Sequence, residues 1–580
     1  MPVYNSDVVD TFNEVADLLE IEGANEFRVR AYRNAARTIS TLSRNVAHMV
    51  EAGEDLTELP GIGEDLAGKI EEIVHTGDLK QLAELRQRTP PEVAEMLDVA
   101  GLGPKRVQTI HEELGVTTLE ELRQAAAQGK IRDLYGLGQK TEQKILEDVE
   151  RLRAEGERER TRRDVAEERV EPLLEFLRSL DAVERVEAAG SYRRKKGTVG
   201  DLDILATSEA GEAVISRFVE YEDVEEIVSQ GETRSTVVFR SGLHVDLRVV
   251  EERSYGAALL YFTGSKAHNI VLRNMALDRG WKINEYGVWD TTGEAAEEEQ
   301  IAGESEEEMY ALLDLPWIAP ELREDRGEVE AARKGRLPDL ITLDDVRGDL
   351  QCHTTASDGR ASLEEMARAA QALGREYLAI TDHSAYIGVT QGLDAEELER
   401  RMDEIDQLNE RMEDIVLLKS VEVDIMEDGS LDLPDRVLEK LDLVTVAVHS
   451  HFDLPAEEQT ERLIGAMDNP TCNILAHPTG RQIGKRPGYA IDLDRLMDAA
   501  LERGCFMEIN AQPDRLDLDD VASQMARERG LKLAISTDAH STEELAFMRF
   551  GVYQGRRGWL EPEDVLNTRS WDDLKDLIAR

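Results

Sequence analysis

Residues 190–205 read GSYRRKKGTVGDLDIL, and this stretch decides the fold of the middle of the chain. Its end, DLDIL, predicts a strand on which Asp201 and Asp203 are two residues apart and therefore lie on one face. The segment HVDLRVV (244–250) predicts a neighbouring strand with a third acid, Asp246. Carboxylates crowded on one face of a sheet repel each other unless a cation lies between them. The pattern therefore predicts that these three aspartates hold two Mg²⁺, or Mn²⁺, ions.

A phosphate-binding turn precedes this strand. Gly190 and Ser191 can offer backbone amides and a hydroxyl to a phosphate, and Arg194 lies close by in the sequence. A D-x-D pair alone is a weak signal, but with the turn and the arginines the block resembles the nucleotidyltransferase palm of family X DNA polymerases of the beta type. The resemblance implies nucleotide binding by Gly190, Ser191, Arg194 and Gly200. His244 departs from the family pattern, because an arginine usually stands beside the third aspartate.

Two further segments resemble the same family in the same order. YFTGSKAHN (261–269) is similar to its nucleotide-binding turn, and LRNMALDRGWKINEYGV (272–288) to its thumb helix and hairpin. The resemblance implies that Tyr261 and Phe262 abut the sugar and that Asn269 contacts the incoming nucleotide. A core aromatic pair is the alternative for Tyr261 and Phe262. The nucleotide-binding residues added here are Arg160, Tyr261, Phe262, Gly264, Asn269 and Arg273.

An internal repeat occupies the N-terminal part. LPGIGEDLAGKI (59–70), VAGLGPKRVQTI (99–110) and LYGLGQKTEQKI (134–145) each place G-[IL]-G before a predicted helix. The glycines permit a tight turn whose amides can bind a phosphate. A plain turn is the alternative for one copy, but three copies resemble helix-hairpin-helix elements, which hold the DNA backbone without reading sequence. The DNA-binding residues predicted here are Gly61, Gly63, Gly101, Gly103, Lys105, Gly136, Gly138 and Lys140.

Lys69 follows the first of these turns. It matches the lysine with which beta-type enzymes attack 5′-deoxyribose phosphate as a Schiff-base nucleophile, a role that needs a lowered pKa. Asp65 and Arg28 stand where the family has further lysines. An acid four residues before Lys69 raises its pKa. A surface lysine without lyase activity is therefore the alternative.

The last third of the chain alternates short apolar strands with helical patterns, which predicts a barrel of parallel strands. Its strand ends carry the motifs DLQCHTTASDG, ITDHS, VEVD, VAVHSH, LAHPTGR and STDAH. A lone histidine at a strand end is usually a hydrogen-bonded core residue, but five at successive strand ends are unusual core residues. Imidazoles and carboxylates that converge at the mouth of a barrel suit Mn²⁺, Zn²⁺ or Fe²⁺.

These motifs resemble the PHP (polymerase and histidinol phosphatase) domain from about Asp344 onward. The resemblance implies three metal sites and two phosphate clamps. The implied ligands are His353, Glu422 and Asp538 for the first metal, Glu422, His449 and His477 for the second, Asp358, His383 and His540 for the third, and Arg481 and Arg515 for phosphate. Gln351 replaces a family histidine and is a weaker ligand of the first metal. Cys352 is interpreted as a filler beside a ligand, because no base partner is evident.

Composition sets the broad class. The 580 residues carry a formal net charge of −52, from 69 basic and 121 acidic residues spread over most of the chain. Such a surface suits a protein from a saline, halophilic cytoplasm; an ordinary acidic protein is the alternative. Three cysteines argue against a disulfide scaffold, and no run approaches ~18 apolar residues. We expect a soluble cytoplasmic monomer without a membrane partner.

Together these patterns and resemblances imply a multidomain fold: α-helical helix-hairpin-helix domains, an α/β nucleotidyltransferase palm with an α+β thumb, and a PHP-type (β/α) barrel. The predicted boundaries are 1–85 (helix-hairpin-helix, lyase-like), 86–155 (fingers), 156–262 (palm), 263–318 (thumb), 319–340 (linker) and 341–580 (PHP). The implied function is gap-filling repair synthesis on gapped or nicked DNA from deoxynucleoside triphosphates, with 3′-5′ exonuclease or abasic-site endonuclease activity of the PHP domain. The alternatives are a PHP phosphoesterase with a non-catalytic polymerase-like DNA-binding scaffold, and a repair scaffold without catalysis.

Overall fold

The computed structural model describes residues 5–40, 42, 46–59, 61–86, 88–99, 102–134, 137–146, 149, 160–290, 299–386 and 392–579. Contacts divide the chain into two compact units, Met1–Glu159 and Arg160–Arg580. None of the helices described has both the length and the apolar character needed to cross a membrane.

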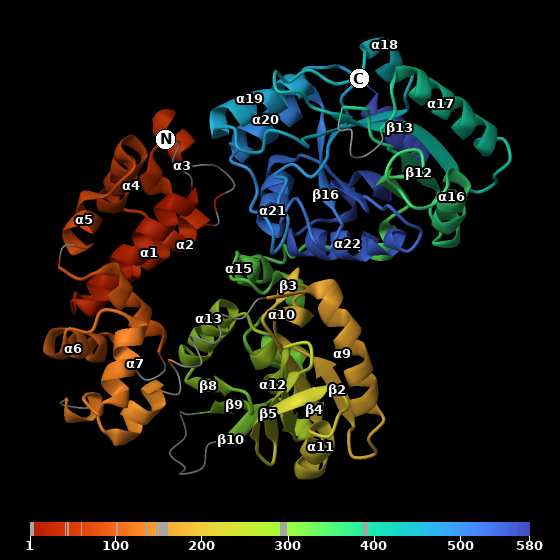
Figure 1. Ribbon diagram of the computed structural model, residues 1–580. Helices are drawn as coiled ribbons and strands as arrows, with labels where there is room; N and C mark the ends of the chain where they lie inside the picture. The colour runs from red at the N-terminus through yellow and green to blue at the C-terminus, as the bar shows by residue number, and fades with distance from the viewer. Residues whose placement is uncertain are drawn as a thin grey trace. The chain divides into compact units, whose positions relative to one another are not determined.

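The first unit is helical (Figure 1). Its main helices are α1 (Asn5–Ile21), α2 (Glu26–Ser40), α3 (Val46–Glu51), α4 (Glu64–Thr76), α5 (Lys80–Arg86), α6 (Pro104–Leu114) and α7 (Leu119–Ala127). Helices α4 and α6 start directly after Gly63 and Gly103, whose extended backbone ends the turn. Glycine has no side chain to cap the first-turn amides, which leaves the amides of Glu64 and Asp65 in α4 and of Lys105 in α6 for a ligand; Pro104, the first residue of α6, has no N–H. The unit contains two apolar cores, one that includes the first copy of the repeat and one that includes the second and third copies.

The second unit begins with a five-stranded sheet, the mixed-sheet domain, in the order β2-β4-β7-β6-β5. The strands are β2 (Arg185–Ala188), β4 (Asp201–Thr207), β5 (Val224–Gln230), β6 (Arg234–Phe239) and β7 (His244–Val250). Helices α9 (Arg163–Arg178) and α11 (Gly211–Phe218) contribute their apolar faces to one core with the sheet. Along β7, buried and partly buried residues alternate strictly, so Asp246 points away from this core.

A smaller α+β segment follows, the clamp segment. It contains α12 (Tyr255–Thr263), α13 (Lys266–Leu277), β8 (Trp281–Asn284), β9 (Gly287–Asp290), β10 (Glu299–Ala302) and α14 (Glu306–Leu312). Its three strands form an antiparallel sheet. Helices α10 (Gly190–Arg193) and α12 contact each other and β4, so the clamp segment begins beside the acidic strand. Helix α15 (Glu328–Arg333) leads onward to the last domain.

The last part is the barrel domain, seven strands paired in parallel from β11 to β17. The strands are β11 (Gly348–Cys352), β12 (Tyr377–Ile380), β13 (Val416–Asp424), β14 (Leu443–Ala447), β15 (Ile474–Leu475), β16 (Phe506–Asn510) and β17 (Leu533–Ser536). A bridge between Cys352 and Ala539 brings the first strand back to the last, so the barrel is nearly closed. The strands are buried on both faces, as their continuous apolar runs predict.

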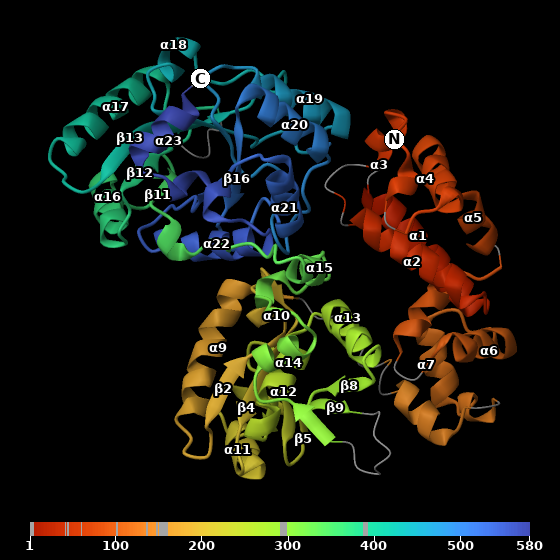
Figure 2. The same ribbon diagram turned by 180° about the vertical axis from the view of Figure 1, so that it is seen from behind.

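Helices surround this barrel (Figures 1 and 2). They are α16 (Leu363–Ala372), α17 (Ala395–Asn409), α18 (Asp435–Leu438), α19 (Ala456–Met467), α20 (Leu493–Arg503), α21 (Asp520–Arg529), α22 (Met548–Arg557) and α23 (Trp571–Ile578). Reciprocal capping boxes start α16 and α17: Ser362 with Glu365, and Asp394 with Glu397. The strand-then-helix alternation predicted from the sequence is therefore confirmed, and it places the strand ends at one mouth.

Candidate functional site

Three carboxylates meet on one face of the mixed sheet. Strands β4 and β7 pair in parallel, with Asp203 directly opposite Asp246 and Asp201 opposite His244. Thr236 donates a hydrogen bond to Oδ1 of Asp246 at 2.5 Å. The predicted D-x-D spacing and the predicted neighbouring strand thus bring the three acids to neighbouring positions.

Asp203 lies at the centre of this group, and its pKa is raised to about 7. Burial is the largest cause, and the charges of Asp201 and Asp246 add to it, whereas Arg248 and Arg194 oppose it. Such mutual repulsion is relieved by a cation between the carboxylates, so these hard oxygen donors fit a divalent ion. Their chemistry therefore agrees with the cation predicted from the sequence.

A cavity of about 550 Å³ opens in front of Asp201 and Asp203; Asp246 is not among the residues that line it. It is lined by residues of α10, β4, α12 and α13 and by the turns between them. Its lining is Arg160, Gly190, Ser191, Arg194, Lys196, Asp201, Asp203, Tyr261, Phe262, Gly264, Lys266, Asn269, Ile270 and Arg273. Of the predicted nucleotide-binding residues, only Gly200 is outside this lining, and it packs on Arg160, whose Nη1 would lie 3.1 Å from an added Cβ.

The polar groups around the cavity are held by hydrogen bonds. Arg160 donates from Nε to Oγ1 of Thr198 at 2.9 Å, and Asn269 donates to the carbonyl of Tyr261 at 2.8 Å. The guanidinium of Arg248 lies over the ring of Phe262, 4.2 Å from its centroid. Sequence reasoning missed Arg248, although its position two residues after Asp246 places it on the same face.

A second group of titratable side chains fills the mouth of the barrel, and Glu422 is at its centre. Four imidazole nitrogens lie close to this carboxylate: Nε2 of His477 at 3.0 Å, Nε2 of His353 and of His449 at 3.3 Å, and Nδ1 of His383 at 3.5 Å. Burial lowers the pKa of His449, but Glu422 and Asp424 raise it more, to about 10. The buried carboxylate of Glu422 thus contacts four histidines that come from different strand ends.

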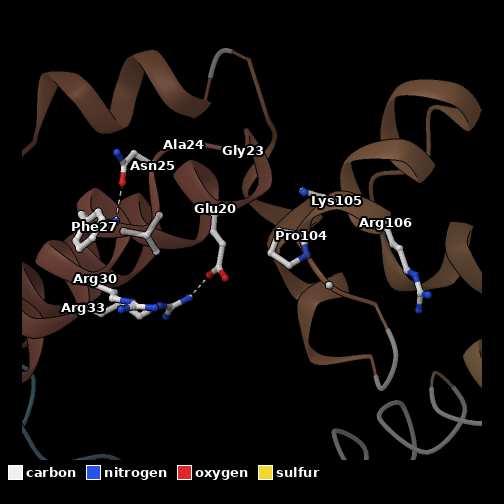
Figure 3. Close-up of a pocket in the computed structure, with 12 residues that line it drawn as sticks. Glu20, Gly23, Ala24, Asn25, Phe27, Arg30, Arg33, Pro104, Lys105 and Arg106 are labelled. Carbon is white, nitrogen blue, oxygen red and sulfur yellow. Dashed lines mark hydrogen bonds and ion pairs between the residues drawn. The ribbon is translucent and has the colours of Figure 1, made fainter. Parts of the chain in front are cut away.

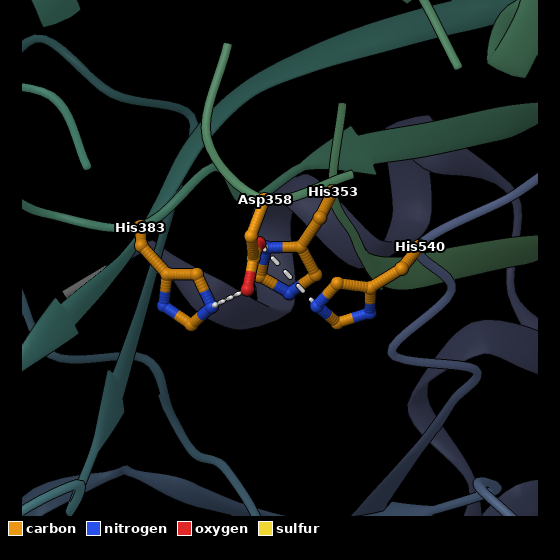
Figure 4. A group of neighbouring side chains, drawn as sticks. All are labelled: His353, Asp358, His383 and His540. Carbon is orange, nitrogen blue, oxygen red and sulfur yellow. Dashed lines mark ion pairs between the residues drawn. The ribbon is translucent and has the colours of Figure 1, made fainter. Parts of the chain in front are cut away.

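Three sets of ligand atoms in the described part of the chain are close enough to hold metal ions. They are His353, Asp358, His383 and His540; His383, Glu422 and His449; and His353, Glu422 and Asp538. Figure 4 shows the first set, in which His383 and His540 point toward Asp358 from separate segments. The last set equals the predicted first-metal ligands, and the first contains the predicted third-metal ligands. In the remaining set His383 stands where His477 was predicted, although His477 contacts Glu422.

Unpaired polar atoms test whether these residues fit a metal. Among the described residues, Oε1 of Gln351 and Nδ1 of His353 are buried without a hydrogen-bond partner. Nε2 of Gln351 lies 3.5 Å from Oδ1 of Asp538, so the amide does reach this group. Buried polar atoms without partners are rare, and bound cations are one reason for them. The residues therefore fit metal ions, with Gln351 beside the first set.

The two predicted phosphate clamps have different surroundings. Nε of Arg515 lies 3.9 Å from Oδ2 of Asp538, beside the metal-binding group. Arg481 instead donates from Nε to the carbonyl of Arg515 at 2.9 Å and from Nη2 to that of Leu516. The Arg481 guanidinium thus forms its hydrogen bonds with main-chain carbonyls of the loop that carries Arg515. The Cys352 thiol is fully buried, which raises its pKa, as expected of a filler.

Further residues orient the ligands of the barrel. Nδ1 of His449 is 2.9 Å from Oδ1 of Asp424, which lies two residues after Glu422 on β13. Asn510 donates to Oδ2 of Asp538 at 3.1 Å and to Glu508 at 3.1 Å. Such partners fix the orientation of a metal-binding side chain. The alternation in VEVD could have indicated Asp424; Asn510 carried no signal in the sequence.

The first unit contains a cavity of about 1050 Å³. Figure 3 shows its lining, which includes the exposed ring of Phe27 and four basic side chains, Arg30, Arg33, Lys105 and Arg106. The predicted DNA-binding residues Gly103 and Lys105 belong to it. Gly61 and Gly63 lie at the start of α4, and Gly138 and Lys140 at the start of the third repeat's helix. Gly101 and Gly136 lie outside the described residues.

Lys69 lies on α4 with its side chain mostly buried. Nζ forms an ion pair with Asp65 and lies 5.3 Å from the centroid of the Tyr32 ring. Burial lowers the pKa of Lys69, but Asp65 and Tyr32 raise it more, so the net shift is upward. The acid expected to act on this lysine is therefore paired with it, and a protonated amine is a poor nucleophile.

Comparisons with known proteins cover the whole chain. Family models match a helix-hairpin-helix domain at residues 3–79, a SAM-like helix-hairpin-helix tandem at 93–151, a DNA polymerase beta thumb at 258–324 and a PHP domain at 349–511. The DNA polymerase/3′-5′ exonuclease PolX of Bacillus subtilis (strain 168) is 38% identical over 580 residues, 100% of each chain. A probable phosphatase of Caldanaerobacter subterraneus subsp. tengcongensis is 32% identical over 36% of this chain and 79% of its own. One of Acetivibrio thermocellus is 30% identical over 34% and 80%.

Proposed function

The chain belongs to the PolX family of DNA polymerases, and from this premise we propose that it fills gaps in DNA and trims 3′ ends at two separate sites. The mixed-sheet domain is the palm and the barrel is the PHP domain. One observation carries the polymerase assignment: a single cavity brings Asp201 and Asp203 together with the phosphate-binding turn, the arginines and the Tyr261-Phe262 pair.

In the palm, Asp201, Asp203 and Asp246 would hold Mg²⁺ or Mn²⁺. The bound ions supply positive charge that activates the primer 3′ hydroxyl and neutralises the triphosphate of the incoming nucleotide. Ser191 and Arg194 bind the triphosphate, since the turn offers a hydroxyl and the guanidinium lies in the same cavity. Tyr261 would abut the sugar, which is supported by its position in the lining of the cavity, and its carbonyl accepts a hydrogen bond from the Asn269 amide.

In the PHP domain, the clustered histidines and acids would hold up to three ions, Mn²⁺ or Zn²⁺. The bound ions supply an activated water and neutralise the scissile phosphate. Arg515 binds a non-bridging phosphate oxygen, and Arg481 holds the loop that carries it. Asp424 fixes the ring of His449 through Nδ1, which leaves Nε2 facing Glu422. The reaction is hydrolysis of a phosphodiester at a 3′ end, or beside an abasic site.

The first unit would bind the DNA that both sites use. The amides at the starts of α4 and α6 and the four basic residues of the large cavity suit a phosphate backbone. We propose gapped or nicked duplex as the substrate, with a repair role and a monomeric enzyme. For Lys69 we propose phosphate binding in preference to lyase chemistry, because Asp65 and Tyr32 raise its pKa.

A phosphoesterase with a non-catalytic polymerase scaffold is the second candidate. The probable phosphatases, which match about a third of this chain, are the observation in its favour. Against it, a scaffold has no need for a cavity that combines Asp203 with Arg194 and the Gly190-Ser191 turn. We therefore place polymerisation first.

Reciprocal variants test the two sites on one gapped duplex with supplied Mg²⁺ or Mn²⁺. Asp203→Ala is expected to abolish nucleotide incorporation and to keep DNA binding and 3′ trimming, because the metal charge is lost only in the palm. His449→Ala is expected to abolish trimming and abasic-site cleavage and to spare incorporation. Extension by Asp203→Ala at the parental rate would remove the palm assignment, and trimming by His449→Ala at that rate would remove the PHP assignment.

A further inference from the structure

Glu324 lies between the nucleotide cavity and the PHP barrel, and two arginines share it. Its Oε1 accepts a hydrogen bond from Nε of Arg194 at 3.0 Å and another from Nη1 of Arg557 at 3.0 Å. Nζ of Lys196 lies 3.6 Å from its Oε2. Burial raises the pKa of Glu324, but Arg557, Arg194 and Lys196 lower it more. The carboxylate is therefore charged at neutral pH and holds both arginines.

Arg557 is the last residue of α22 and belongs to the PHP barrel. Its side chain is 5% exposed, and its Nη2 lies 2.5 Å from Oδ2 of Asp520, the first residue of α21. Its Nη1 also donates to the main-chain carbonyl of Arg194 at 2.8 Å. One guanidinium of the barrel thus binds both the backbone of Arg194 and Glu324, the acid that binds the Arg194 side chain.

Arg194 faces the palm site. Its Nη1 donates to the carbonyl of Thr263, and its Nε is bound by Glu324. The side chain lines the nucleotide cavity, and its charge lowers the pKa of Asp203. A guanidinium fixed on two of its nitrogens presents its charge to a phosphate in one orientation, so little rotamer freedom is lost when the phosphate binds.

The contact between palm and barrel is closely packed around these residues. Arg163 is buried, with its guanidinium 4.3 Å from the ring centroid of Tyr192 and 5.0 Å from that of Tyr553 in the barrel. A Cβ added to Gly197 would lie 2.5 Å from Cδ1 of Leu516. Because this contact leaves little room, Arg557 and Arg194 keep a defined separation.

We propose that Arg557 is a positioning residue for nucleotide incorporation, which fixes the Arg194 guanidinium through Glu324 and the Arg194 carbonyl. The inference rests on the proposed function, because it takes Arg194 to be a triphosphate ligand. The PHP barrel then contributes to the nucleotide affinity of the palm without taking part in its chemistry. Loss of the Arg557 guanidinium should therefore raise the KM for the nucleotide and leave the rate of 3′ trimming unchanged.

The test measures gap filling by the full chain, with KM and kcat determined separately. Arg557→Met is expected to raise the KM for a deoxynucleoside triphosphate roughly tenfold and to change kcat less than about twofold. Arg557→Lys keeps the charge but not the planar fork, so it recovers part of the loss. Arg549→Met is the matched control: it lies on the same helix and pairs across the same contact with Glu167 at 3.3 Å. Its KM should stay at the parental value, and all variants should trim 3′ ends alike.

A double-variant cycle separates positioning from a structural role. If Arg557 acts through Arg194, Arg557→Met adds nothing to the KM of Arg194→Met. Additive effects, or an equal rise in KM for Arg549→Met, would overturn the inference. If Arg194→Met keeps the parental KM, Arg194 is not a triphosphate ligand, and the proposed function of this residue fails. If Arg194→Met raises the KM but Arg557→Met keeps the parental value, only the positioning role of Arg557 is overturned. If Arg557→Met does not fold, Glu324→Gln takes its place with the same expectation.

Discussion

At the scale of single residues, Gly190 shows how little space surrounds the palm carboxylates. Its φ is +57°, and an added Cβ would overlap Oδ2 of Asp203. We expect Gly190→Ala to reduce incorporation about a hundredfold, because displacing a metal-binding carboxylate by about 1 Å costs that much. Single-nucleotide gap filling at saturating nucleotide measures the effect.

Gly374→Ala is the control for this substitution. Gly374 also has a left-handed φ, +75°, but an added Cβ would meet no atom within 4 Å. It should lose about 1 kcal/mol of stability from the backbone and keep its incorporation rate. Equal rates for the two variants would mean that the crowding of Asp203 has no catalytic consequence.

Gln351 is the residue at which the barrel departs from its family pattern. Its amide is buried beside Asp538 with Oε1 unpaired among the described residues. An amide oxygen is a weaker ligand than an imidazole, so trimming should require supplied Mn²⁺ and fall in chelator. We expect Gln351→His to lower the Mn²⁺ concentration that gives half-maximal trimming, as seen in a metal titration. A purified parental enzyme that trims at full rate after chelation would contradict this.

Some of these residues could be predicted from the sequence and others could not. The two-residue period of a strand is enough to place Asp203 beside Asp246, because a parallel neighbour preserves the register. The orientation of Arg481 toward loop carbonyls depends on a turn that no local pattern specifies. The contact of Glu324 with Arg557 joins positions 233 residues apart, beyond the reach of any sequence period.

At the scale of elements, the start of α14 connects the thumb to the palm through Glu306. This carboxylate lies 2.7 Å from Nη1 of Arg193 and 2.5 Å from Nη1 of Arg323. Trp317 also donates to it at 2.9 Å. Burial raises the pKa of Glu306, but Arg323 and Arg193 lower it more, to about 2. The element is therefore held by one buried anion between two cations.

A pH dependence of stability follows from this pKa. A folded-state pKa below the ordinary 4.5 stabilises the fold above pH 4.5, and the stabilisation is lost as the pH falls toward 2. The shift corresponds to about 3 kcal/mol. We expect the parent to be more stable than Glu306→Gln at pH 7, with a difference that shrinks below pH 4.5. Denaturant unfolding at a series of pH values measures this difference.

Glu330→Gln provides the comparison for that series. Glu330 is exposed and pairs with Lys334 at 2.9 Å on α15. Exposed ion pairs contribute little to the free energy of unfolding. The difference in this free energy between Glu330→Gln and the parent should therefore stay near zero at every pH. A difference for Glu306→Gln that is constant with pH would contradict the low pKa.

Helices and strands could be predicted from the sequence more reliably than the contacts of single side chains. The alternation of apolar strands with helices predicted the barrel, because buried parallel strands need continuous apolar runs. The repeat predicted helices after Gly63 and Gly103, and both are present. The two-residue strand β15 shows the limit, since so short a run has no period of its own.

At the scale of the whole molecule, the net charge of −52 predicts a dependence on salt. At 0.1 M salt the screening length is about 10 Å, so the surface acids repel one another; at molar salt it is about 3 Å. We expect the melting temperature to hold or rise from 0.1 M to molar KCl, with incorporation retained. A melting temperature that falls steadily over this range, measured by calorimetry, would contradict a surface adapted to salt.

The shared carboxylate of Glu324 has a consequence for the order in which the enzyme matures on the ribosome. Arg194 is synthesised 363 residues before Arg557. A nascent palm can fold its sheet and pair Arg194 with Glu324 early, but Arg557, which binds both Glu324 and the Arg194 carbonyl, arrives only when the barrel is translated and packed. Full affinity for the nucleotide then arrives only after the domain that removes 3′ ends is in place, so a truncated translation product without that domain would need a higher nucleotide concentration to polymerise.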